Sequence, residues 1–289
     1  MASFTFTPLH ATFVAQATGP DLRDVHDPET LAELRAGMER YGVLVFRQQP
    51  FNDAEQIAFA ERFDGVLHTK TGISALARSR FGNEALTDIS NVDENGDVLD
   101  AGDRRRMYGL ANRLWHTDAS FENPPGRFSL LSARVIPATG GDTEFADMRA
   151  AWEALSPERQ AEIESLTVHH SIAWSREMLG FTFSPEERQR LHGNPQPLVR
   201  HSPVTGRRAL YLASHAEEIV GMPRPEGRLL LRDLMEHATA PRFVHRHAWQ
   251  DGDLVIWDNR TTMHRATPFD DRQQRRELRR VTTLDVPVA

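Results

Sequence analysis

The chain has 289 residues, a formal net charge of −7 and no cysteine. The absence of cysteine excludes disulfide scaffolds, iron–sulfur clusters and thiolate zinc sites, and the acidic balance argues against a broad nucleic-acid-binding surface. Because no apolar run approaches the ~20 residues that span a bilayer and the N-terminus lacks a secretory signal, we expect a cytoplasmic protein that binds neither nucleic acid nor membrane.

The N-terminal part of the chain alternates predicted strands with short helices. Residues 4–16 alternate in polarity and are rich in Thr, Phe and Val, which favours strands. Apolar spacing near 3.6 predicts a helix over 29–40, followed by a strand at 43–46 and by a second helix over 53–63 that starts with an acidic cap. The polar stretch 93–113, with its run of three arginines, is predicted to be a long solvated loop.

The C-terminal part contains more strands, with helices inserted between them. Strands are expected at 127–136, 143–146, 197–201, 208–213, 243–249, 253–257 and 276–285, and helices at 148–154, 157–166 and 226–238. Residues 176–195 are polar with helical spacing, and the pattern does not place them. Strands at both ends of the chain predict an α+β protein with a β-sandwich or jelly-roll core, in a single domain spanning 1–289.

A His-x-Asp pair is the most informative local feature. In an extended segment His116 and Asp118 point to the same face, so both can bind one ion. Imidazole nitrogen and carboxylate oxygen together suit Fe(II), Mn(II) or Zn(II), and His264, which follows a strand-like run and a polar turn, is the candidate third ligand. The alternative is a surface histidine paired with an aspartate.

Two arginines alternate near the C-terminus. Arg276 and Arg280 are expected to face the same side of the last strand, about 13 Å apart, so they need not bind the same anion. The planar guanidinium can bind a carboxylate through two charge-assisted hydrogen bonds. A solvated basic strand is the alternative for this arginine-rich segment.

Together these motifs resemble the taurine dioxygenase family of Fe(II)/2-oxoglutarate oxygenases. The matching motifs are His116-x-Asp118, Gly140-Gly141-Asp142-Thr143, Trp257-Asp258-Asn259-Arg260, His264 and Arg276/Arg280. The resemblance runs from about residue 8 to the C-terminus, and within the family it is strongest to the 2,4-dichlorophenoxyacetate/2-oxoglutarate dioxygenases.

The resemblance implies a double-stranded β-helix (jelly-roll) core with flanking and inserted helices. It implies that His116, Asp118 and His264 bind Fe(II), that 2-oxoglutarate chelates this iron, and that one position remains for dioxygen. Arg276 and the hydroxyl of Thr143 would bind the distal carboxylate of 2-oxoglutarate. The products from this co-substrate would be succinate and CO2.

The same resemblance implies an aryloxyacetate-like small molecule as the substrate. Hydroxylation of the carbon next to the ether oxygen would release a phenol and glyoxylate. Arg280 is the expected partner of the substrate carboxylate, and Asn112, Lys70 and His215 are further candidates for substrate contact. We also expect a homo-oligomer.

Other functions remain open at the level of the sequence. The same chemistry could act on an alkyl sulfonate or sulfate ester such as taurine, or on another natural carboxylate. The segments 66–80 and 108–114 are expected to line the pocket and to separate these substrates. Two other classes are a metal-binding jelly roll without oxygenase activity and a zinc hydrolase.

Overall fold

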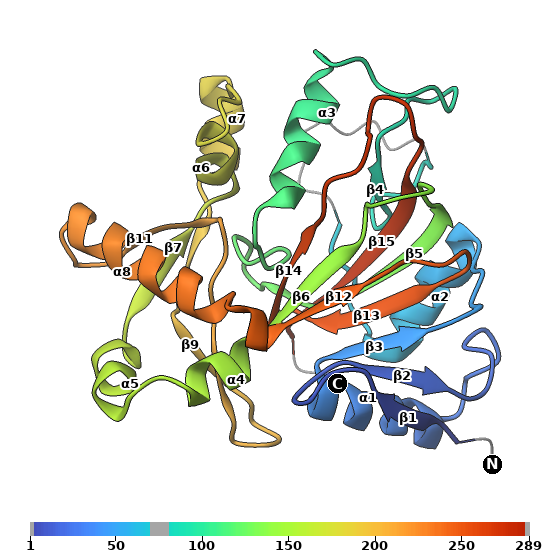
Figure 1. The fold of residues 1–289 in the computed structure, drawn as a ribbon, viewed down its shortest axis with the longest axis horizontal. Helices are drawn as coiled ribbons and strands as arrows, with labels where there is room; N and C mark the ends of the chain where they lie inside the picture. Colours follow the sequence, from blue (N-terminus) through green and yellow to red (C-terminus); the bar gives the residue numbers. More distant parts are fainter. Residues whose placement is uncertain (1–2, 70–80, 287–289) are drawn as a thin grey trace.

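A seven-stranded sheet forms the larger part of the fold. The computed structural model describes residues 3–69 and 81–286. In spatial order, the strands of the large sheet are β1 (Thr5–Pro8), β2 (Ala15–Thr18), β3 (Val43–Phe46), β13 (Leu254–Asp258), β5 (Gly126–Val135), β15 (Glu277–Leu284) and β4 (Thr87–Ser90). All neighbouring pairs are antiparallel except β2 and β3. The sheet therefore combines strands from both ends of the chain (Figure 1).

Three smaller sheets complete the β structure. Their strands, again in spatial order, are β12 (Val244–His247), β6 (Thr143–Asp147) and β14 (Thr262–Ala266); β11 (Ala216–Ile219), β7 (Thr167–His170) and β8 (Asn194–Pro197); and β10 (Arg208–Leu210) with β9 (Val199–His201).

Helices are placed between the strands and at the edges of the molecule. They are α1 (Pro28–Tyr41), α2 (Asp53–Asp64), α3 (Arg104–Gly109), α4 (Met148–Glu153), α5 (Pro157–Ile163), α6 (Ile172–Glu177), α7 (Pro185–Arg190) and α8 (Arg224–Ala238), with short 3₁₀ turns at Leu110–Arg113 and Pro241–Phe243. Within residues 3–69 and 81–286, no helix has the length and apolar character needed to cross a membrane. The expected combination of helices and sheets is confirmed.

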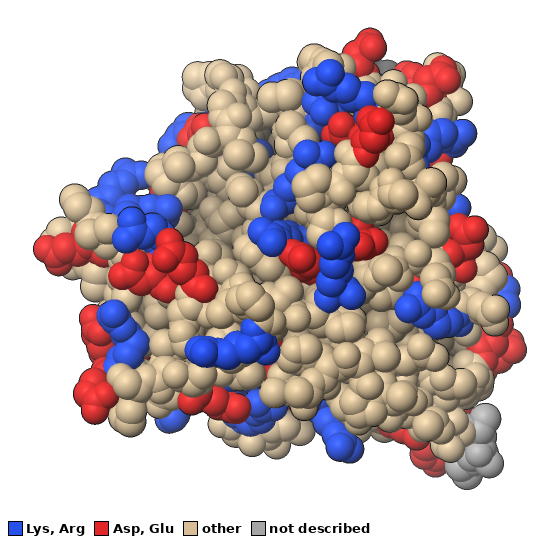
Figure 2. Space-filling model, in the orientation of Figure 1, with Lys and Arg blue, Asp and Glu red and all other residues tan. Residues whose placement is uncertain are grey.

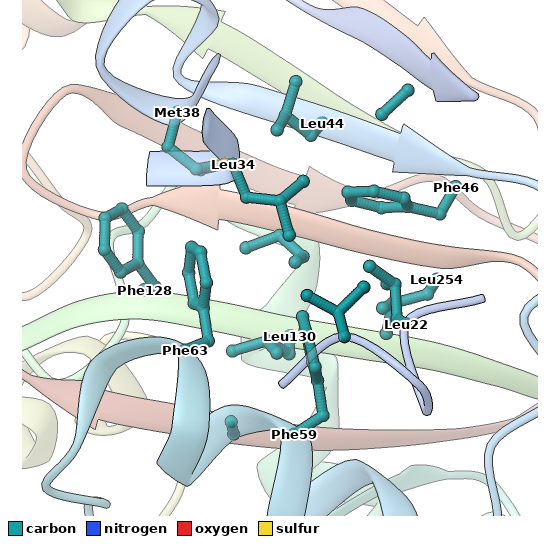
Figure 3. Packing of buried hydrophobic residues seen from close by; sticks show 14 of the residues in the cluster. Leu22, Leu34, Met38, Leu44, Phe46, Phe59, Phe63, Phe128, Leu130 and Leu254 are labelled. Carbon is teal, nitrogen blue, oxygen red and sulfur yellow. The ribbon is translucent and has the colours of Figure 1, made fainter. Parts of the chain in front are cut away.

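Strand β3 contributes to two separate cores. Leu44 and Phe46 join the cluster that α1 and α2 form against the large sheet (Figure 3). Val43 and Val45 point to the opposite face, as alternation along a strand requires, and they join a cluster that includes Phe145 of β6. The large sheet is therefore covered by helices on one face and by the sheet containing β6 on the other.

The predicted loop at 93–113 is wrong in its second half. Residues 104–109 form α3, which begins after Asp103 because the Asp103 side chain accepts a hydrogen bond from the backbone N–H of Arg105 at 2.7 Å. The arginines are also paired rather than simply solvated, since Arg104 lies 2.9 Å from Glu187 and Arg106 lies 3.1 Å from Asp271. Figure 2 shows basic and acidic side chains interspersed over one face of the molecule.

Two further differences concern the helix and strand boundaries. Helix α2 is capped by Asn52, which accepts from the backbone N–H of Glu55, rather than by the acidic residue that follows. Residues 262–266, to which the sequence analysis assigned no strand, form β14 by pairing along the length of β6. Cross-strand pairing outweighs the weak strand propensity of this polar segment.

Buried histidines make the stability of the fold sensitive to acid. His170 is fully buried on β7, and burial lowers its pKa to about 3. Protonation is easier in the unfolded chain, so the free energy of unfolding falls as pH decreases below about 6.5. We expect His170→Asn to remove up to about 2 kcal/mol of the stability difference between pH 8 and pH 5, measured by denaturant unfolding. The matched control is His169→Asn, on the opposite face of β7; equal pH slopes in the wild type and His170→Asn would contradict the expectation.

Candidate metal and substrate site

Two backbone hydrogen bonds place two histidines that are distant in the sequence directly opposite each other. The N–H of His116 donates to the carbonyl of His264 at 3.0 Å, and the N–H of His264 donates to the carbonyl of His116 at 2.9 Å. Asp118 lies beside them, with its carboxylate oxygens 3.8 Å from Nε2 of His116 and 3.7 Å from Nε2 of His264. The three buried side chains offer ligand atoms that all lie within 4.8 Å of one another. The expected convergence of these residues is confirmed.

The cluster holds its members in the protonation states that metal binding requires. Burial lowers the pKa of His116 to about 4, and it lowers the pKa of His264 well below its usual value. Burial raises the pKa of Asp118, but Arg280 and the two histidines outweigh this effect and lower it to about 2. At neutral pH the cluster therefore presents two neutral imidazoles and one carboxylate, the forms that coordinate metal ions.

A hydrogen-bond network fixes the Asp118 carboxylate. Ser129 of β5 donates to Oδ2 at 2.8 Å, and Arg280 of β15 donates from Nη1 to Oδ1. Asn259 accepts from the backbone N–H of Asp118 at 3.1 Å and donates to the Ser129 hydroxyl at 2.9 Å. The indole N–H of Trp257 donates to Asn259 at 3.0 Å, which fixes the orientation of the amide. Strands β5, β13 and β15 and the turn after β13 thus set the position of the Asp118 carboxylate.

This network predicts that Ser129→Ala weakens metal binding without removing any ligand. The loss of its hydrogen bond leaves Asp118 less firmly oriented, and we expect the affinity for Fe(II) to fall by about 10-fold, measured by anaerobic titration. Ser132→Ala is the matched control, because Ser132 lies on the same strand with similar burial but donates to Gln56 instead. Equal losses of affinity in the two variants would contradict a specific role for Ser129.

A cavity of about 350 Å³ opens onto the cluster. Its volume lies within the range typical of small-molecule sites. The apolar part of the lining comes from side chains in several elements: Leu99, Leu110, Phe121, Leu131, Ile172, Leu191, Trp257 and Phe269. The cavity can therefore hold an apolar group beside the metal cluster.

Arg276 and Thr143, the residues that the family resemblance pairs, both line this cavity. Arg276 is buried, its Nε donates to the carbonyl of Gly141 at 2.9 Å, and burial lowers its pKa to about 10. A side chain at Gly141 would lie 3.2 Å from Arg276, and its φ of +70° also favours glycine. Thr143 accepts from the indole N–H of Trp249 at 3.1 Å, so the threonine proton is free to donate elsewhere.

Three of the four residues expected to contact the substrate lie in the described part of the chain and line the cavity. They are Asn112, His215 and Arg280, and the expected 108–114 segment contributes residues 108–110, 112 and 113 to the wall. His215 is buried with its ring 6.0 Å from that of His116 and 5.1 Å from that of Phe121. Lys70 lies outside the described residues.

The sequence analysis did not single out Arg176 as a cavity residue. Arg176 of α6 lines the cavity, and its guanidinium carbon lies 4.6 Å from the centre of the ring of Tyr108, which belongs to the 108–114 segment expected to line the pocket. Arg176 belongs to the polar segment that periodicity did not place, and it does not stand in a spacing that would have revealed it.

Fold and site together define a protein with a candidate metal site, in which two histidines and a carboxylate lie beside a buried arginine in one cavity. The family described as taurine catabolism dioxygenase TauD, TfdA family matches residues 5–282. The chain belongs to this family, which confirms the resemblance seen in its sequence.

Individual relatives cover nearly the whole chain. It is 44% identical over 284 residues to the alpha-ketoglutarate-dependent 2,4-dichlorophenoxyacetate dioxygenase of Cupriavidus pinatubonensis, covering 98% of each protein. It is 36% identical over 282 residues to the (S)-phenoxypropionate/alpha-ketoglutarate-dioxygenase of Sphingobium herbicidovorans, covering 94% of this chain and 92% of the relative. The crystal structure of AAD-2 in complex with Mn(II) and N-oxalylglycine has a TM-score of 0.89 and 45% identity, over 99% of this chain and 98% of that one.

Proposed function

We propose that the protein is an Fe(II)- and 2-oxoglutarate-dependent dioxygenase that hydroxylates the carbon next to the ether oxygen of an aryloxyacetate. One molecule each of substrate, 2-oxoglutarate and dioxygen would give the phenol, glyoxylate, succinate and CO2. The observation that carries the proposal is the convergence of His116, Asp118 and His264 on a cavity with a buried arginine, in a chain similar to 2,4-dichlorophenoxyacetate dioxygenases.

The donor set fits Fe(II). Two neutral imidazoles and one carboxylate on one face leave adjacent coordination positions open, as in the non-heme iron oxygenases. We infer that His116, Asp118 and His264 are the iron ligands. When bound there, iron supplies the redox chemistry that couples decarboxylation of 2-oxoglutarate to hydroxylation of a C–H bond.

The remaining residues of the cavity would bind and orient 2-oxoglutarate and the substrate. Arg276 has no carboxylate partner among the described residues, so an incoming carboxylate would neutralise a buried cation. With the Thr143 hydroxyl it is suited to the distal carboxylate of 2-oxoglutarate. The apolar lining would hold the aromatic ring and exclude water from the reacting carbon. We further infer that the two sheets facing each other across Phe145 form a double-stranded β-helix within a single domain.

The test is a substrate panel, scored by the release of succinate and of phenol. The protein is loaded anaerobically with Fe(II), mixed with 2-oxoglutarate and exposed to oxygen with 2,4-dichlorophenoxyacetate, phenoxypropionates, taurine or an alkyl sulfate. We expect aryloxyacetates to give stoichiometric phenol and succinate. Strong turnover of taurine or the alkyl sulfate with uncoupled turnover of the aryloxyacetates would overturn the substrate assignment. Activity without oxygen or 2-oxoglutarate would instead indicate a hydrolase.

A further inference from the structure

A buried tryptophan lies directly behind the cavity wall. The indole N–H of Trp249 donates to the hydroxyl oxygen of Thr143 at 3.1 Å. Thr143 lines the cavity, whereas Trp249 is 8% exposed and does not line it. Any effect of the indole on a molecule in the cavity therefore passes through Thr143.

The indole determines which role the Thr143 hydroxyl can play. A hydroxyl can both donate and accept, but an indole N–H can only donate. Because Trp249 donates to the Thr143 oxygen, the single Thr143 proton has to be given to a different group. Within residues 3–69 and 81–286, the Thr143 hydroxyl donates to none. The hydroxyl therefore offers its proton to an acceptor in the cavity, and the hydrogen bond that it accepts makes it a stronger donor.

The strand before Trp249 holds the indole at the level of the hydroxyl. His247 of β12 pairs in register with Thr143 of β6, so the chain reaches Trp249 from a point directly beside Thr143. The buried His247 ring lies edge-on to the Trp249 ring, with 4.6 Å between the ring centres and 89° between their planes. This contact limits rotation of the indole.

A buried carboxylate fixes the turn that follows Trp249. Asp253 is fully buried, and its Oδ2 accepts from the backbone N–H of Gln250 at 2.8 Å. The same oxygen pairs with Arg47 and lies 3.2 Å from Nε2 of His247. Removing a partner from a buried carboxylate is strongly unfavourable, so the turn after Trp249 is held as firmly as the strand before it.

Arg276 approaches the same part of the cavity from the other sheet. It directly precedes β15, and its Nε donates at 2.9 Å to the carbonyl of Gly141, two residues before Thr143. The guanidinium supplies positive charge, and the oriented hydroxyl supplies a neutral donor with a fixed direction. The two oxygens of one carboxylate can accept from both groups.

We propose that Trp249 is a positioning residue for 2-oxoglutarate, because it orients the Thr143 hydroxyl to donate to the distal carboxylate. The proposal rests on the function proposed above and extends it to a residue that does not touch the co-substrate. The indole thereby contributes to the preference for a 2-oxo acid that carries a second carboxylate.

The test compares the binding of two 2-oxo acids. Dissociation constants for 2-oxoglutarate and for 2-oxopentanoate, which lacks the distal carboxylate, are determined by anaerobic calorimetry on the Fe(II)-loaded protein. In Trp249→Phe we expect 2-oxoglutarate to bind about 3- to 10-fold more weakly and 2-oxopentanoate to bind as in the wild type. In turnover, the KM for 2-oxoglutarate should rise while kcat stays unchanged.

A double-mutant cycle tests whether the effect passes through Thr143. Thr143→Val should weaken 2-oxoglutarate binding by about 10- to 100-fold, since it removes a hydrogen bond to a charged group. Adding Trp249→Phe to Thr143→Val should then weaken it no further. Independent, additive losses would show that Trp249 acts by another route and would overturn the proposal.

Two more variants separate the hydrogen bond from packing. Trp152→Phe is the matched control, because Trp152 is also a buried tryptophan but packs in the core of α4 and α8 and does not line the cavity. It should leave both affinities unchanged even where it lowers the Tm. Replacement of Trp249 by benzothienylalanine keeps the size and shape of the ring and removes only the N–H, so it should reproduce the affinities of Trp249→Phe and serves in its place if that variant does not fold.

The remaining outcomes distinguish this proposal from the proposed function. If the wild type prefers 2-oxoglutarate over 2-oxopentanoate and the variants without the N–H keep the full preference, the role of Trp249 is wrong and the proposed function stands. If these variants lose affinity for both acids equally, Trp249 supports the site only by packing, and the proposal is again overturned. If the wild type binds no 2-oxoglutarate, the proposed function itself fails.

Discussion

Asp118→Asn is expected to eliminate Fe(II)-dependent turnover. The carboxylate is the single anionic member of the cluster, and two imidazoles alone give a weaker and less selective site. Residues that only orient metal ligands contribute about 10- to 100-fold to affinity or activity, so loss of a ligand should exceed about 100-fold. The measurements are anaerobic Fe(II) titration and succinate release.

A closely matched control exists elsewhere in the fold. Asp64 is also buried, and it accepts from Nη1 of Arg127 at 2.9 Å and from the Thr283 hydroxyl at 2.6 Å, much as Asp118 accepts from Arg280 and Ser129. Asp64→Asn removes a buried, arginine-paired carboxylate without touching the cluster. It should lower stability but leave Fe(II) affinity unchanged. If both variants lose iron to the same extent, the effect of Asp118→Asn is one of folding rather than ligation.

The metal cluster could be predicted from the sequence because it depends on the types and the spacing of a few residues. His-x-Asp places two donors on one face of any extended segment, and no partner from the tertiary structure is needed to recognise the pair. His264 was a candidate third ligand because it follows a strand-like run and a polar turn, and the family resemblance supported it, although the bridge that brings it to His116 joins segments almost 150 residues apart. The roles expected for Arg276 and Thr143 came from the matching family motifs.

The helix α3 and the place of Arg176 in the cavity could not be predicted from the sequence, because both depend on contacts between segments that are distant in the chain. The α3 segment is polar, ends in Gly109 and follows Gly102 closely, so local composition favours a loop. It is helical because Asp103 caps it and because Glu187 and Asp271, far along the chain, pair with its arginines. Arg176 resembles any other arginine of a polar helix until α6 is placed against the cavity.

Arg276→Met should raise the KM for 2-oxoglutarate by about 30- to 5000-fold. Removing one partner of a buried, hydrogen-bonded ion pair is unfavourable by about 2–5 kcal/mol, because the carboxylate that remains is left unpaired. The effect should fall on KM more than on kcat, since the distal carboxylate is remote from the decarboxylated end of the co-substrate. The measurement is succinate release as a function of 2-oxoglutarate concentration.

A co-substrate that lacks only the distal carboxylate separates recognition of that charge from a general disturbance of the site. 2-Oxopentanoate has the same reactive end and chain length but no distal carboxylate, so the wild type should prefer 2-oxoglutarate and Arg276→Met should not. Arg279→Met is the matched control, because Arg279 is similarly buried on β15, three residues after Arg276, but pairs with Glu277 and does not line the cavity. If Arg276→Met keeps the wild-type preference for 2-oxoglutarate, the distal carboxylate is bound by another cation of the cavity and the role assigned to Arg276 is wrong.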